Sequence, residues 1–236
     1  MKVAIYGQYY LNSVEPIKEI FSFFNSNNLE IIIETEFLKV LDEKNIVQKE
    51  YKTFSSQTAL DQSFDMLISI GGDGTILRAA TLVQDSGVPI LGINAGRLGF
   101  LATVQKENIA AFMQLIIEKK YTISKRTLLS LSCSPDNESI QSLNFAMNEI
   151  TVSRKDSTSM ITVETYLNGE FLNSYWADGL IISTPTGSTG YSLSCGGPIL
   201  TPDVKSLVIT PIAPHNLNAR PLVVPDETEI RLKVSG

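Results

Sequence analysis

The chain has 236 residues, of which 43% are hydrophobic and 19% charged, a composition typical of a folded globular protein and not of a disordered one. Its formal net charge is −6 and no cluster of lysine and arginine residues stands out, which argues against nucleic-acid binding. The longest apolar runs are far too short to cross a membrane, so we expect no membrane partner.

The N-terminus and the cysteines indicate the cellular compartment, and the single histidine limits the kinds of metal site and catalytic triad that are possible. The first residues lack the charged and then apolar segments of a signal peptide. Cys133 and Cys195 stand in dissimilar contexts, which favours free thiols over a disulfide framework, and we therefore expect a cytoplasmic protein. His215 is the single histidine, which excludes a histidine-rich zinc site and any histidine-dependent triad that does not use it.

The first half of the chain alternates between strand-like and helix-like segments. Ile17, Ile20, Phe21 and Phe24 recur at helical spacing and predict a helix with one apolar face. Strands are expected at residues 3–6, 29–33, 64–70 and 88–91, and helices at residues 14–25, 75–84 and 109–118. This alternation predicts a parallel sheet with helices on its faces.

The second half is mostly strand-like. Short strands are expected at residues 128–133, 145–153, 160–167, 170–176, 179–184, 207–212, 222–224 and 229–234. Asn168-Gly169 predicts a hairpin between two of them, because a type I′ turn needs positive φ at both central residues. We expect an antiparallel β domain here and place the boundary within residues 121–126, which gives domains of residues 1–124 and 125–236.

The strand expected at residues 64–70 runs into the segment GGDGT at residues 71–75 and then into a helix. Glycines let a ligand approach the backbone, and free N–H groups at a helix start attract anions, so the segment predicts a phosphate site. A carboxylate repels phosphate, so Asp73 indicates proton abstraction or metal binding. Alone, the segment fits equally a βα turn in which Asp73 caps the helix. It is neither a Walker A loop nor a dinucleotide fingerprint.

Two further segments have weaker meanings by themselves. Residues 92–100 follow an expected parallel strand, where ligands of open α/β sheets collect, but an ordinary glycine-rich connection looks the same. Asn148 and Glu149 lie in a β-type run, so in a regular strand one of them points inward and needs partners. A bulge or a strand end with both side chains in water is the alternative.

The strongest local signal lies at residues 178–198, where a short apolar strand enters a turn rich in hydroxyl groups and glycines. This turn offers many hydrogen-bond donors, and Tyr191 offers a ring that can stack on a base or pack on a ribose. A flexible Ser/Thr/Gly loop is the alternative, and the ordered texture on both sides argues against it. His215 lies in a proline-containing turn, where a lone histidine is more often structural than catalytic.

Taken together, these segments resemble the NAD kinase family, and the resemblance covers nearly the whole chain. GGDGT alone is shared with lipid kinases of the diacylglycerol kinase type and, in related form, with phosphofructokinases. The downstream Asn-Glu pair and the Thr-Pro-Thr-Gly-Ser-Thr segment make the resemblance specific. The motifs that match in order and spacing are at residues 71–75, 94–100, 148–149, 178–198, 214–217 and 220–221.

The resemblance implies an enzyme that transfers the γ-phosphate of ATP to the 2′-hydroxyl of the adenosine ribose of NAD, with a divalent cation, usually Mg²⁺. It implies a Rossmann-like parallel α/β domain followed by an antiparallel β-sandwich domain. Asp73 would be the general base, and the metal ligands are not indicated. The phosphate-binding residues would be Gly71, Gly72, Gly74, Thr75 and Arg78. The NAD-binding residues would be Phe100, Asn148, Glu149, Asp178, Thr186, Thr189, Gly190, Tyr191 and Ser194.

The family's aspartate at the position of Asp178 reaches a pocket of a neighbouring subunit, so the resemblance also implies a homodimer or homotetramer. Gly190 departs from the family, which usually has alanine there; the change should loosen the turn slightly and remove no donor. Related chains continue for several tens of residues beyond the position of Gly236 and complete the β domain. We expect oligomer stability and activity to depend on that part.

Two alternatives to an NAD kinase remain. A lipid kinase would need an apolar channel for its acceptor, whereas residues 186–194 are rich in hydroxyl groups. A non-catalytic dinucleotide-binding module would gain nothing from a carboxylate, Asp73, that faces phosphate. Motifs alone do not establish an activity.

Overall fold

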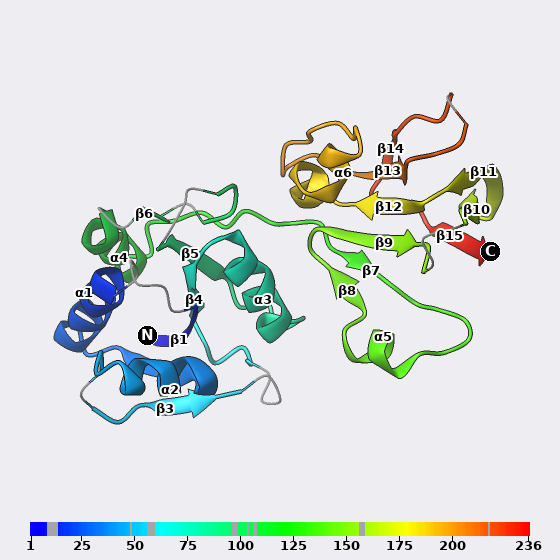
Figure 1. Cartoon of the computed structure of the whole chain (residues 1–236). Coiled ribbons are helices and arrows are strands. Elements are labelled where there is room, and N and C mark those ends of the chain that lie inside the picture. The colour runs from blue at the N-terminus through cyan, green and yellow to red at the C-terminus, as the bar shows by residue number, and fades with distance from the viewer. Residues whose placement is uncertain are drawn as a thin grey trace. The chain divides into compact units, whose positions relative to one another are not determined.

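The computed structural model describes residues 1–8, 14–47, 49–55, 60–95, 99–102, 104–105, 108–155, 159–216 and 218–236 (Figure 1). The chain divides into two compact units, Met1–Ile123 and Ser124–Gly236. Each unit has its own hydrophobic core. None of the helices in these ranges is long and apolar enough to cross a membrane.

The first unit is built on a six-stranded sheet in the order β3-β2-β1-β4-β5-β6, and every pair is parallel. The strands are β1 (Lys2–Gly7), β2 (Glu30–Glu34), β3 (Lys52–Phe54), β4 (Met66–Gly71), β5 (Ile90–Asn94) and β6 (Val104–Gln105). The chain moves outward from β1 to β3 on one side and from β4 to β6 on the other. The order therefore reverses between β1 and β4, as in doubly wound folds.

Helices cover both faces of this sheet (Figure 1). They are α1 (Val14–Ser26), α2 (Thr35–Glu43), α3 (Asp73–Val83) and α4 (Ile109–Ile117). Alternate residues of β1 enter different core clusters: Val3 and Ile5 pack with α1, α2 and α4, whereas Ala4 and Tyr6 pack with α3. This alternation follows from the two-residue period of a strand, and it confirms the predicted parallel α/β architecture.

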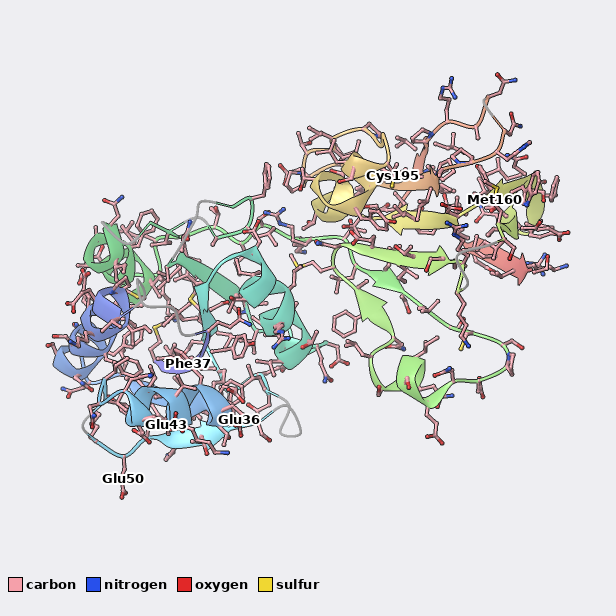
Figure 2. The ribbon with its side chains drawn as sticks, in the orientation of Figure 1. Glu36, Phe37, Glu43, Glu50, Met160 and Cys195 are labelled. Atoms are coloured by element: carbon pink, nitrogen blue, oxygen red, sulfur yellow. The ribbon has the colours of Figure 1, made fainter. Side chains whose placement is uncertain are left out.

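The sequence did not predict α2, β3 or β6. In α2 only Phe37 and Leu41 are buried, whereas Glu36 and Glu43 lie on the exposed side (Figure 2). Two buried residues give too short an apolar stripe to recognise. Strand β3 buries only Phe54, because it is the edge of the sheet.

The second unit consists of antiparallel sheets, as predicted. A four-stranded sheet has the order β14-β13-β12-β9, a three-stranded sheet the order β11-β10-β15, and β7 pairs with β8. The strands are β7 (Leu129–Ser130), β8 (Phe145–Ala146), β9 (Glu149–Ser153), β10 (Ile161–Leu167), β11 (Glu170–Ala177), β12 (Gly179–Ser183), β13 (Ser206–Ile212), β14 (Leu222–Pro225) and β15 (Ile230–Ser235). Short helices are α5 (Glu138–Ser142), η3 (Thr186–Thr189, a 3-10 helix) and α6 (Tyr191–Ser194).

One core joins the two larger sheets of this unit. It includes Val163 of β10, Tyr175 of β11, Leu180 of β12 and Ile209 of β13. Side chains of both sheets meet in it, so the sheets pack face to face as a sandwich. The Asn168-Gly169 hairpin is confirmed: both residues have positive φ, at 50° and 87°, and the β10 and β11 strands pair on either side.

Candidate functional site

The GGDGT segment lies at the carboxyl end of β4, beside the point where the strand order reverses. The neighbouring strand β1 ends there too, and the Gln8 N–H donates to the Ile70 carbonyl oxygen over 3.1 Å. The Thr75 hydroxyl also bonds the Gln8 side chain, over 3.3 Å. In open α/β sheets this switch point is where ligands bind, so the fold puts the predicted phosphate segment at the expected place.

Different physical reasons explain why glycine stands at the three glycine positions of this segment. A Cβ at Gly71 would stand 2.8 Å from the Thr75 Cβ, so the packing of Thr75 requires glycine. Apart from the adjacent residues and the backbone of the helix itself, no atom of the described residues lies within 4 Å of where a Cβ of Gly72 or Gly74 would stand. Packing within the chain therefore does not require these two glycines, and their backbone is open to a ligand. They precede and begin α3, whose first N–H groups favour an anion.

Asp73 does not cap the helix. It is the first residue of α3, Gly72 is the N-cap, and no side chain within the described ranges caps this end. Instead, Oδ2 of Asp73 accepts the N–H of Phe100 over 2.7 Å. Oδ1 accepts the N–H of Leu101 over 2.9 Å and that of Ala102 over 3.3 Å. We call residues 99–102 the cradle, because their backbone surrounds this carboxylate.

Two other predicted residues of the first unit are exposed. Arg78 lies one turn further along α3. The Phe100 side chain is 75% exposed, although its backbone N–H is bonded to Asp73, so its ring is available to a ligand. Of the predicted segment at residues 94–100, residues 96–98 lie outside the described residues, as does Leu217 of the turn that contains His215.

In the second unit, Asn148 immediately precedes β9 and Glu149 is its first residue. Their positions next to β12 bring them to the turn that follows β12, since Glu149 pairs with Ser183. The Asn148 Oδ1 and Glu149 Oε2 atoms are both buried and have no hydrogen-bond partner among the described residues. The alternative in which both side chains lie in water is therefore wrong. Burial also raises the pKa of the Glu149 carboxyl.

Two unpartnered buried acceptors from adjacent residues make this position a candidate for ligand binding. Buried polar atoms are nearly always bonded, because a missing bond costs about 1–3 kcal/mol. Since Asn148 Oδ1 and an ionised Glu149 Oε2 can only accept, the group that satisfies them must donate N–H or O–H. Sugar hydroxyl groups and exocyclic amino groups have this chemistry.

The turn after β12 is fastened to Asn148 by backbone contacts. The Thr184 N–H donates to the Asn148 carbonyl oxygen over 2.8 Å, and the Thr184 hydroxyl donates to the Met147 carbonyl oxygen over 2.6 Å. Gly187 lies against Asn148 so closely that a Cβ would stand 2.7 Å from the Asn148 Cα. At Gly190 a Cβ would stand 3.3 Å from Glu149 Oε2, so Gly190 lies directly beside the unpartnered carboxylate.

The remaining predicted residues of this turn lie on the helices η3 and α6. The turn is therefore not the flexible loop that was the alternative. Thr186 and Thr189 are half-buried, whereas Tyr191 and Ser194 are exposed at the start and end of α6. Buried hydroxyl groups attach η3 and α6 to the rest of the unit. Ser188 Oγ accepts the Leu200 N–H over 2.9 Å, and Ser192 Oγ lies 2.8 Å from Thr210 Oγ1. The exposed side chains therefore stand on a fixed base.

Asp178 is not brought together with Asn148 and Glu149. It precedes β12, whereas the turn follows it, and the six steps from Asp178 to Thr184 span about 20 Å at roughly 3.3 Å per residue. Its Oδ1 lies 3.2 Å from Arg154 Nε in a partly buried ion pair. Nearby, the His215 N–H donates to the Trp176 carbonyl oxygen over 2.9 Å, and the centroids of the two rings lie 4.4 Å apart with the rings tilted by 43°.

Sequence reasoning missed several residues of the site. The cradle residues Gly99, Leu101 and Ala102 act through backbone atoms, and Gly187 acts through the absence of a side chain. Arg154 was missed because an ion pair between neighbouring strands leaves no motif. The signal that was available is the glycine-rich texture of residues 92–100.

Over the part of the chain that the structure describes, no group of three His, Cys, Asp or Glu side chains could hold a metal ion by itself. Mg²⁺ at phosphate-transfer sites usually takes only one or two carboxylates and completes its shell with phosphates and water. The described residues therefore suit an ion that is held mainly by the phosphates of a bound nucleotide and by water.

Comparisons with known proteins agree with this geometry. The ATP-NAD kinase N-terminal domain family matches residues 12–121, and the ATP-NAD kinase C-terminal domain family matches residues 147–235. NAD kinases of Flavobacterium johnsoniae and Bacteroides fragilis are 76% and 44% identical over the whole chain, which covers 81% and 80% of their lengths.

Solved structures give the same result for the fold. A yeast NADH kinase complexed with NADH superposes with a TM-score of 0.85 and 28% identity, over 99% of this chain and 72% of the yeast chain. An NAD kinase from Archaeoglobus fulgidus in complex with ATP has a TM-score of 0.72 and 28% identity, over 99% of this chain and 81% of its own.

Proposed function

This chain belongs to the ATP-NAD kinase family, and from that premise we propose that it phosphorylates the 2′-hydroxyl of the adenosine ribose of NAD with ATP. The 2′-oxygen forms a bond to the γ-phosphorus while the bond from that phosphorus to the β,γ-bridging oxygen breaks. The products are NADP and ADP, and the hydroxyl proton passes to Asp73. Residues 1–124 would carry phosphate transfer, and residues 125–236 would bind NAD.

The observation that supports this mechanism best is the setting of Asp73. It begins a helix whose N-terminal glycines, Gly72 and Gly74, have open space above their backbone. An anion-binding turn supplies a place for phosphates, and a carboxylate within it supplies a base. A binding module without chemistry would not benefit from that carboxylate.

We assign the two acceptor atoms at the start of β9 to the dinucleotide. Asn148 Oδ1 and Glu149 Oε2 need donors, which the ribose and the base of NAD can supply. The exposed Tyr191 ring of the second unit offers a flat apolar face for stacking. Phe100, whose ring is exposed on the first unit, is proposed as a further contact of NAD. The other residues that we propose to line this pocket are Thr186, Thr189, Gly190 and Ser194.

Phosphate contacts and the metal ion complete the proposal. Gly71 and Thr75 would shape the phosphate turn, and the Arg78 guanidinium would add a positive charge beside it. Mg²⁺ would be held by the ATP phosphates and water, because the cradle already occupies most lone pairs of Asp73. When bound, the ion neutralises charge on the phosphoryl group.

Asp178 suggests a shared site. It is too far along β12 to meet Asn148 within the same unit, so we propose that it serves a neighbouring subunit of a homodimer or homotetramer. Arg154 would hold it in place. We also propose a cytoplasmic location, which suits the free thiols of Cys133 and Cys195.

One assay tests the function. The protein is incubated with ATP, Mg²⁺ and either NAD or diacylglycerol, and NADP is detected with an NADP-specific dehydrogenase. We expect NADP and no phosphorylated lipid. Phosphorylated lipid would identify a lipid kinase, and calorimetric binding of NAD without NADP at any donor concentration would identify a non-catalytic module.

A further inference from the structure

Gly99 lies against the carboxylate of Asp73. A Cβ at position 99 would stand 2.5 Å from Asp73 Cγ and from Oδ2, closer than Cβ atoms are ever found to other atoms. The contact with Asp73 is a physical reason for glycine at this position, because any side chain there would have to displace the carboxylate.

We infer that the cradle sets the direction of the Asp73 carboxylate and that Gly99 is its positioning residue. A carboxylate has about four lone-pair directions, two on each oxygen. Oδ1 accepts two backbone N–H groups, from Leu101 and Ala102, and Oδ2 accepts one, from Phe100. One lone pair of Oδ2 remains, and the cradle aims it.

This geometry deepens the proposed function, on which it rests. The hydroxyl proton has one acceptor direction available, the remaining lone pair of Oδ2, and rotation of the carboxylate would break up to three hydrogen bonds. Backbone donors suit this task because they cannot change rotamer. The positioning is thus supplied by a segment more than 25 residues away in the sequence, between β5 and β6.

The substitution Gly99→Ala should change the position of the Asp73 carboxylate without disrupting the fold. Of the two partners in the contact, the Asp73 side chain moves more easily than the backbone, so the added methyl group should displace the carboxylate and leave the fold intact. We expect kcat for NADP formation to fall by about 10–100-fold, with the KM for NAD within about threefold. Gly87→Ala is the control: it places alanine at a positive φ of 76° in the same unit, so it should lower Tm slightly and leave kcat unchanged.

The same substitution in an Asp73→Asn background gives the decisive comparison. If Gly99 acts through the carboxylate, adding Gly99→Ala to Asp73→Asn should cause little further loss. An equal loss in both backgrounds would show that Gly99 acts independently of Asp73 and would overturn the inference, as would a wild-type kcat in the single variant.

Amide hydrogen exchange tests the cradle without any activity. The N–H groups of Phe100 and Leu101 should exchange faster in Asp73→Ala than in wild type, and keep their protection in Asp85→Ala, which changes an exposed residue after α3. Unchanged exchange in Asp73→Ala would exclude the cradle even if NADP is formed. Lost protection in a protein that forms no NADP would keep the cradle and reject the proposed function.

Discussion

Gly187 packs directly on the backbone of Asn148, with no room for a side chain between them. The contact joins the turn after β12 to the start of β9, and the bond from the Thr184 N–H to the Asn148 carbonyl oxygen reinforces it. Because Asn148 also carries one of the two unpartnered acceptors, the position of this acceptor depends on a residue that has no side chain at all.

Gly187→Ala should therefore destabilise the second unit and weaken NAD binding together. The methyl group would have to displace main-chain atoms of Asn148, and overpacking of this kind costs about 1–3 kcal/mol or more. We expect Tm to fall by several degrees, measured by differential scanning calorimetry, and the Kd for NAD to rise. Gly190→Ala is the matched control.

At Gly190 the added Cβ would stand 3.2 Å from the Gly187 carbonyl oxygen and 3.3 Å from Glu149 Oε2. These contacts require shifts of only a few tenths of an ångström. Gly190→Ala should therefore change Tm by less than Gly187→Ala does. Equal losses at the two positions would contradict the packing argument.

Asp73→Asn should nearly abolish turnover. The amide keeps the size of the carboxylate but cannot take the hydroxyl proton, and loss of a general base typically costs about 10²–10⁴-fold in rate. NAD affinity should stay within a few-fold. Steady-state kinetics and calorimetry measure the two effects, with Asp85→Asn, an exposed carboxylate near the end of α3, as the control. Turnover at the wild-type rate in Asp73→Asn would reject the assignment of the base.

Glu149→Gln should weaken NAD binding and stabilise the folded protein. Burial raises the pKa of the Glu149 carboxyl, so between its unfolded pKa and its folded pKa the folded state binds more protons than the unfolded state. The free energy of unfolding therefore rises as the pH falls through that window, and above the window the ionised carboxylate lowers the stability of the folded state. Removing the charge should raise Tm modestly at pH values above that window and weaken NAD binding by about tenfold.

The pH dependence identifies the cause. The Tm advantage of Glu149→Gln should shrink as the pH falls toward the ordinary pKa of a glutamate, because the wild-type carboxyl is then protonated as well. Glu138→Gln, at an exposed position of the same unit, should show no such advantage. A gain that persists unchanged at low pH would point to packing and not to charge.

Shared sites can be tested by complementation. If Asp178 serves a neighbouring subunit, Asp73→Asn and Asp178→Asn impair different parts of the same site, contributed by different chains. Coexpression of the two variants should regain activity, since some mixed sites combine an intact Asp73 with an intact Asp178. Each variant expressed alone is the reference. Activity no higher than in those references, in oligomers that contain both chains, would exclude a shared site.

The elements that the sequence predicted are those with a strong apolar period. Helix α1 buries Ile17, Ile20, Phe21 and Phe24, and its pattern was sufficient to locate it. Helix α6 was not predicted, because it is only four residues long and two of them are serines, which favour turns and caps. The structure orders it through the buried Ser192 hydroxyl, a contact with β13 that no local pattern records.

The site shows the same division. Side chains in motifs, such as Asp73 and Glu149, were predicted by position and type. The contact between Asp73 and Phe100 was not, because it joins residues 27 positions apart and uses a backbone N–H that every residue except proline has. A single sequence does not reveal that a glycine is closely packed, as at Gly99, because glycine also occurs in turns for its conformational freedom.

Under the proposed function, the two acceptors near the start of β9 would distinguish ligands by the hydrogen-bond donors that they offer. Asn148 Oδ1 and Glu149 Oε2 have the same polarity, so a ligand edge with two hydrogens satisfies both, and an edge that offers a lone pair meets repulsion at one of them. A dinucleotide whose base carries a carbonyl group in place of an amino group would differ little in size, and yet competition binding should show it weaker than NAD by an amount that corresponds to about 1–3 kcal/mol. Discrimination of this kind needs no steric barrier, and one substitution that turns an acceptor into a donor would reverse its preference.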